Sequence, residues 1–140
     1  MDSRYLETLL NVSPIAVVLS AVMMMVVGSL WYSSFFFGKA WMRLSGIRMS
    51  DIHQNDARRG YVFATFFSLL IAYLLGVVAA HAVAHPSALI SSIVTIWIFV
   101  MAEQANGFIW EKQPFALFLL QAFRSLFSLL AGATVFLFWT

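Results

Sequence analysis

Cysteine is absent from this chain of 140 residues, and charged residues are scarce. The lack of cysteine excludes disulfides, thiolate metal sites and cysteine nucleophiles. Lys, Arg, Asp and Glu together make up 10% of the residues, whereas they make up about a quarter of a typical soluble domain. So few charges would not cover a water-exposed surface of this size. We therefore expect lipid to surround most of the molecule.

Apolar residues make up 62% of the chain and gather into four long stretches. Each stretch is close to the roughly 20 residues that a helix needs to cross the hydrocarbon core of a membrane. None of them alternates with the period of two that a membrane strand shows. The sequence therefore predicts a single-domain, all-α membrane protein with four transmembrane helices. The expected spans are residues 14–37, 61–84, 88–109 and 115–139.

The beginning of the first span has a recognisable signal, because Ser13 precedes Pro14. Serine is a common helix cap, and proline suits the first helical turn. The residues before it include Asp2, Arg4 and Glu7 instead of the basic run of a signal peptide. We expect this segment to remain attached to the first span.

Residues 38–60 form the one sizeable polar segment. Lys39 and Arg43 are four residues apart, while Trp41 and Leu44 are apolar, which predicts a short amphipathic helix at the membrane interface. Further on, Ser50-Asp51 is typical of a helix start, with a serine cap and an acidic first turn. We expect the second long helix to begin near Asp51.

Basic residues flank the spans unevenly, and this bias predicts the orientation. Six lie in residues 38–60 or in the link before the last span, and one, Arg4, lies on the opposite side. We therefore expect residues 38–60 in the cytoplasm and both termini outside. The net charge of +2 is too small to indicate a nucleic-acid partner, so membrane lipid is the partner that the sequence predicts. The six basic residues are Lys39, Arg43, Arg48, Arg58, Arg59 and Lys112.

A motif covers the end of the first span and the residues after it: Gly-Ser-Leu-Trp-Tyr-Ser at 28–33, then Phe-Gly-Lys-Ala-Trp-Met at 37–42. With the Trp-Glu-Lys-Gln-Pro link at 110–114, it resembles the prokaryotic membrane family catalogued as domain of unknown function 1761. The resemblance covers the whole chain and implies a small inner-membrane protein with four helices. It implies no activity. The motif residues are Gly28, Trp31, Tyr32, Gly38 and Trp41.

Two charged residues lie inside predicted spans, Glu103 in the third and Arg124 in the fourth. A charge at the centre of a span costs about 2.5–3.5 kcal/mol on insertion scales, so such groups usually face protein or water. Counted from the short link between these antiparallel helices, the two depths differ by roughly 4–5 Å. We therefore expect Glu103 and Arg124 to pair, with Asn106 and Gln121 beside them. The pair would either fix helix packing or line a path for an ion, proton or solute.

Small residues recur on the second span and allow another helix to approach closely. Ser128 and Gly132 form a similar surface on the fourth span, which we expect to serve a partner subunit. The small residues of the second span are Thr65, Ser68, Ala72, Gly76 and Ala79.

His81 and His85 are spaced as two ligands of one metal ion on a helix would be. No third ligand is near in the sequence, so they are weak candidates, and we expect neither a metal nor a cofactor.

These observations favour a small channel or transporter-like protein, and we expect a homo-oligomer because four short helices leave little room for a path within one subunit. The alternative is a structural or partner-binding membrane subunit without transport or catalytic activity. An enzyme acting on a lipid or quinone has the least support, since only Glu103 would serve as an acid or base and no nucleophile stands out.

The orientation is testable with cysteines introduced at Ser3 and Ser50, because the chain has no native thiol. An impermeant thiol reagent added to intact cells should label position 3 and leave position 50 unlabelled, since residues 38–60 are expected inside. Labelling at position 50 without labelling at position 3 would reverse the assignment.

Overall fold

The computed structural model describes residues 11–82 and 86–139, and its regular structure there is helical throughout. A short helix follows the first long helix, and a single 3₁₀ turn at Met49–Asp51 precedes the second long one. The elements are α2 (Pro14–Trp31), α3 (Gly38–Ser45), α4 (Gln54–Ala82), α5 (Pro86–Ile109) and α6 (Phe115–Phe138).

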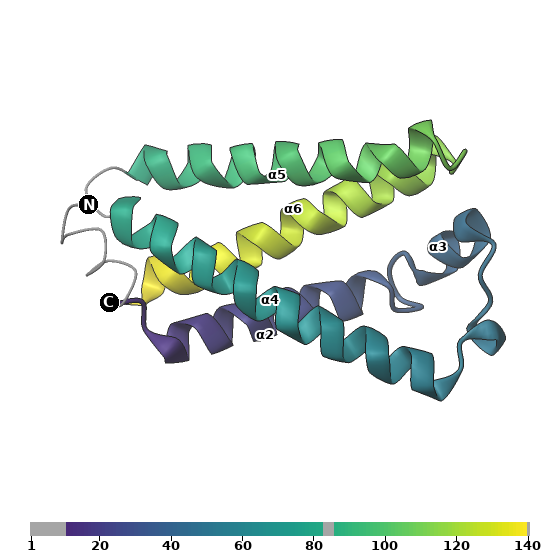
Figure 1. The fold of residues 1–140 in the computed structure, drawn as a ribbon, viewed down its shortest axis with the longest axis horizontal. Helices are drawn as coiled ribbons and strands as arrows, with labels where there is room; N and C mark the ends of the chain where they lie inside the picture. The colour runs from purple at the N-terminus through teal and green to yellow at the C-terminus, as the bar shows by residue number, and fades with distance from the viewer. Residues whose placement is uncertain (1–10, 83–85, 140) are drawn as a thin grey trace.

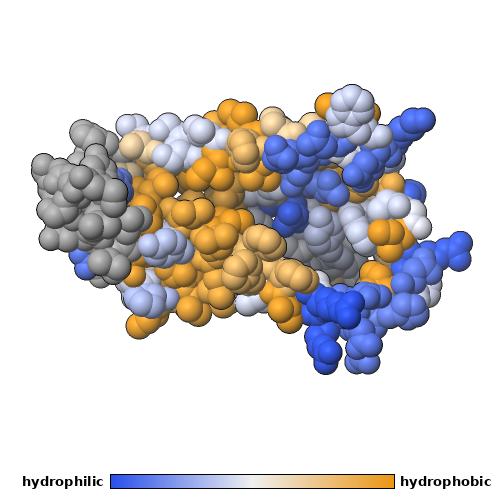
Figure 2. Space-filling model, in the orientation of Figure 1, coloured by the Kyte–Doolittle hydropathy of each residue, from blue (hydrophilic) through white to orange (hydrophobic). Residues whose placement is uncertain are grey.

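Four of these helices, α2, α4, α5 and α6, are long and apolar enough to cross a membrane. They run along one another, with α3 and the α5–α6 link at the same end of the bundle (Figure 1). Hydrophobic residues cover the middle of the molecule, and hydrophilic residues gather at the end that carries α3 (Figure 2). The all-helical fold with four span-length helices agrees with the prediction from the sequence.

The first long helix begins as its sequence predicts and ends earlier than predicted. The Ser13 hydroxyl accepts the Ala16 N–H at 3.4 Å, and Pro14 occupies the first turn. The helix ends at Trp31 because a compact turn follows, in which the Phe37 N–H donates to the Trp31 carbonyl at 3.0 Å. Gly38 closes this turn, since a Cβ there would collide with the Tyr32 carbonyl oxygen.

The short helix α3 matches the amphipathic helix predicted after the first span, and it ends at Gly46 in the left-handed conformation, with φ 73°. The predicted start of the next helix near Asp51, with Ser50 as its cap, is wrong. The Asp51 carboxylate accepts the Arg48 N–H at 3.0 Å within the 3₁₀ turn. Since Asp51 is engaged in that turn, α4 begins later, at Gln54.

The most buried long helix is α6. It packs closely against α2 at Gly132. The Ser20 hydroxyl of α2, which is fully buried, donates to the Gly132 carbonyl of α6 at 2.9 Å. A Cβ on Gly132 would lie 2.9 Å from Met24 Cγ. The face with Ser128 and Gly132 therefore packs inside the subunit, and the expectation that it serves a partner subunit is wrong.

Helix α4 uses the middle of its small-residue stripe in the same way. Ala72 and Gly76 are buried, and a Cβ on Gly76 would lie 2.5 Å from Val12 Cγ1 and 2.8 Å from Phe136 Cε1. At the other end of the stripe, Thr65 is exposed.

The main apolar core lies around the contacts that α4 and α6 make at their small residues. Its buried residues are Met24, Leu75, Ala82, Leu89, Ile93, Leu129 and Ala133.

The packing at Gly132 predicts a position-specific loss of stability. Gly132→Leu places a side chain where Met24 and Ser20 already lie, and overpacking of this kind typically costs about 1–3 kcal/mol. We expect a clear fall in the melting temperature in detergent. Gly60→Leu is the matched control, because no atom lies within 4 Å of a Cβ at that helical position. Equal melting temperatures for the two variants would contradict the assigned contact.

Candidate functional site

The structure does not join the two charged residues that the sequence predicts as a pair. Glu103 is exposed on α5, Arg124 is half-buried on α6, and no ion pair joins them among the described residues. Asn106 is also exposed, and Gln121 is half-buried. The four residues predicted as one polar seam therefore lie in different surroundings.

Other residues connect α5 to α6. The Gln104 side-chain amide donates to the Ser125 hydroxyl at 2.8 Å, and the Trp97 indole N–H donates to the Ala122 carbonyl at 2.8 Å. Gln104 follows Glu103 in the chain, so the contacting face is turned by about 100° from the predicted one. The sequence does contain a signal for this contacting face, because Ile93, Trp97 and Gln104 recur at helical spacing. In the structure, Ile93 on this face is buried.

The two histidines proposed as weak metal ligands remain unassigned. His81 is exposed at the end of α4, with its Nδ1 2.9 Å from the Val77 carbonyl oxygen. His85 lies outside the described residues. Within residues 11–82 and 86–139, no three His, Asp or Glu side chains gather as a metal site would require.

A cavity of about 620 Å³ opens between α2, α3, α4 and α6, and the predicted motif forms much of its wall. Gly28, Tyr32, Gly38 and Trp41 all line it. Trp31, the fifth motif residue, packs beside Phe37 and Phe127, with ring centroids 4.5 and 5.6 Å away. The motif therefore shapes a cavity, which its spacing in the sequence does not reveal.

Among the described residues, Arg124 is the single charged residue in the cavity wall. Its guanidinium carbon lies 5.9 Å from the centre of the Tyr32 ring, a cation–π distance. Tyr32 in turn meets the Trp41 ring edge-on, with centroids 5.5 Å apart. The Arg124 Nε is buried and has no hydrogen-bond partner in the described structure. The Tyr32 ring thus lies against the cation without neutralising its charge.

The rest of the wall is apolar and deformable, with a few hydroxyl groups. Methionine side chains adapt to ligands of different shape because they are unbranched and polarizable. Such a wall with one cation fits a molecule that has an apolar body and one negative charge. The methionines are Met24, Met25, Met42 and Met49, and the hydroxyl groups belong to Ser29, Ser33, Ser34, Tyr61 and Ser68.

One protein family matches this chain, over residues 15–137, and its description is "Protein of unknown function (DUF1761)". The matched range includes the motif at 28–42 and nearly all of the four long helices. No curated protein and no solved structure gives a significant match.

Double-mutant cycles test the contacts between α5 and α6. Glu103→Gln and Arg124→Gln should change the free energy of unfolding additively, within about 0.5 kcal/mol, because the two side chains form no ion pair. Gln104→Ala and Ser125→Ala should instead be coupled by about 0.5–1.5 kcal/mol, because their hydrogen bond is direct. Both cycles are measured by unfolding in detergent. Coupling above about 1 kcal/mol between Glu103 and Arg124 would restore the predicted pair.

Proposed function

The chain belongs to the DUF1761 family of proteins of unknown function, and we propose that it is a transporter-like membrane protein that takes up an organic anion of one negative charge. The site is the cavity lined by Tyr32, Trp41 and Arg124. In this proposal the negative charge of the solute balances the positive charge of Arg124, which no acidic residue among the described lining residues does.

The state of Arg124 is the observation that carries the proposal. It lies nine residues into α6, which is roughly 13–14 Å along the helix axis. A charge at that depth in a span is costly unless it faces protein, water or an ion of opposite sign. Its Nε is buried and makes no hydrogen bond within the described residues, while Arg124, which carries this guanidinium group, is one of the residues that line an open cavity. A carboxylate on the solute would accept two hydrogen bonds from such a group.

The size of the cavity supports the same class of solute. Small-molecule sites commonly occupy about 300–1,000 Å³, and this one occupies about 620 Å³. Tyr32 and Trp41 offer aromatic surface to the apolar part of the solute. A single cation favours one negative charge over two, because a second charge would lie unpaired against an apolar wall.

The packing beyond the cavity favours transport by alternating access over an open pore. Ser20 bonds to Gly132 and Leu75 is buried further along the bundle, so side chains fill the space between these helices. A solute in the cavity would pass only after the helices repack, as in transporters whose halves move around a fixed site. The proposed location is the inner membrane, with both termini outside.

The second candidate function is a partner-binding subunit, and the outer face of α5 favours it. Glu103 and Asn106 are exposed there, on a helix long enough to cross a membrane. Polar groups within a span usually face protein or water. This face, and not the one with Gly132, is therefore the surface that we propose for a homo-oligomer or another subunit.

The test compares a carboxylate with its uncharged amide, using 1-naphthoate and 1-naphthamide. Binding is measured by calorimetry on the purified protein, and uptake is measured in proteoliposomes. The carboxylate should bind at least tenfold more tightly than the amide, and Arg124→Gln should remove most of that difference, because a hydrogen bond to a charged group contributes about 1.5–3 kcal/mol.

Glu103→Gln is the control, since Glu103 does not line the cavity; it should bind the carboxylate as the unmodified protein does. Equal binding of acid and amide, or full binding by Arg124→Gln, would overturn the anion site. Binding without uptake would favour the partner-binding subunit over the transporter.

A further inference from the structure

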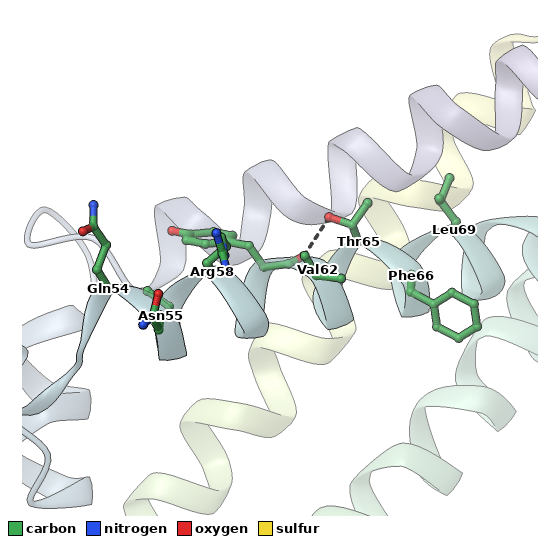
Figure 3. A pocket seen from close by; sticks show the side chains of 9 residues that line it. Gln54, Asn55, Arg58, Val62, Thr65, Phe66 and Leu69 are labelled. Atoms are coloured by element: carbon green, nitrogen blue, oxygen red, sulfur yellow. Dashed lines mark hydrogen bonds between the residues drawn. The ribbon is translucent and has the colours of Figure 1, made fainter.

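A second pocket, of about 950 Å³, lies along the outer face of the first half of α4. Figure 3 shows its two chemically different ends. Gln54, Asn55 and Arg58 surround the end at the start of the helix, whereas Val62, Phe66 and Leu69 form the wall further along. These residues recur every three or four positions and so share one face of α4.

Within the part of the chain that the structure describes, the polar side chain at the apolar end has a hydrogen-bond partner and so does not call for a polar ligand. Thr65 is the polar residue there, and its hydroxyl donates to the Tyr61 carbonyl at 2.8 Å within the same helix (Figure 3). From Arg58 to Leu69 the helix rises by roughly 16 Å. That is about half the thickness of the hydrocarbon core, or one leaflet of a bilayer. The distance from the cationic Arg58 to the far end of the apolar wall at Leu69 is thus close to the depth of one leaflet.

The polar end is cationic because of Arg58 specifically. Arg59 points about 100° away around the helix and does not line the pocket. Asp56, the nearest acidic residue on α4, lies about 160° from Arg58 on the opposite side. The side-chain amides of Gln54 and Asn55 add hydrogen-bond donors beside the guanidinium group.

From this arrangement we propose that the pocket holds an anionic glycerophospholipid, with its phosphate at Arg58 and one acyl chain along Val62, Phe66 and Leu69. The guanidinium group binds phosphate oxygens through paired hydrogen bonds, and the apolar wall distinguishes a lipid from a free phosphate ion. The site does not depend on the proposed solute cavity, with which it shares only Tyr61.

The test uses native mass spectrometry of the full chain in mild detergent, with phosphatidylglycerol and phosphatidylcholine that carry the same acyl chains. The unmodified protein should retain the anionic lipid preferentially. Arg58→Gln should lower that preference about fivefold, which corresponds to the attraction between one basic residue and an anionic lipid surface. Arg59→Gln is the matched control, with the same loss of charge one residue away, and should change the preference less than twofold.

A second matched pair tests the apolar wall without a change in charge. Phe66→Ala should reduce retention of both lipids, whereas Phe67→Ala should not, since Phe67 is exposed but does not line the pocket. Arg124→Gln should leave lipid retention unchanged, which separates this site from the cavity.

Equal losses for Arg58→Gln and Arg59→Gln would mean general attraction to a basic surface and would overturn the site. Displacement of the lipid by an equal concentration of glycerol phosphate would also overturn it, because the apolar wall would then contribute nothing.

Discussion

The contact between α2 and α6 at Ser20 and Gly132 determines most of the arrangement around it. Because Gly132 has no side chain, the buried Ser20 hydroxyl reaches a main-chain carbonyl of the neighbouring helix at 2.9 Å. Two turns away on α6, Arg124 then lies beside Tyr32, which follows the end of α2. A shift of either helix would separate the cation from its aromatic neighbour. The packing of small residues thus positions the charge of Arg124 in the cavity wall.

The turn after α2 is the second element on which the cavity depends. Gly38 fits against the Tyr32 carbonyl only because it lacks a Cβ. This close approach brings α3 back over the end of α2, so that Trp41 meets Tyr32 edge-on. The motif residues are therefore linked by geometry: the glycine allows the turn, and the turn brings the two aromatic rings together beside Arg124.

The two proposed sites each use one arginine, and they differ in depth and surroundings. Arg124 lies within a span and lines a cavity that opens between four helices, so it would act on a small solute. Arg58 lies at the start of α4 beside an open face, so it would act on a lipid at the surface of the bundle. Of the residues that the structure describes, Tyr61 is the one that lines both pockets. Two of the chain's few charges, Arg58 and Arg124, thus lie where a negatively charged molecule would be bound.

The sequence by itself determined the number of long helices, the cap at Ser13, the short helix after the first span and the family. These follow from local properties: the length of apolar runs, the chemistry of helix ends and a motif within 28–42. It did not determine which face of each helix meets which neighbour, because a span that is apolar on all sides carries little rotational signal. One residue is a rotation of about 100°, and so Gln104, not Glu103, meets α6. Only the tertiary structure decided that Gly132 packs within the subunit and that Arg124 lines a cavity, since both depend on side chains more than 80 residues apart coming into contact.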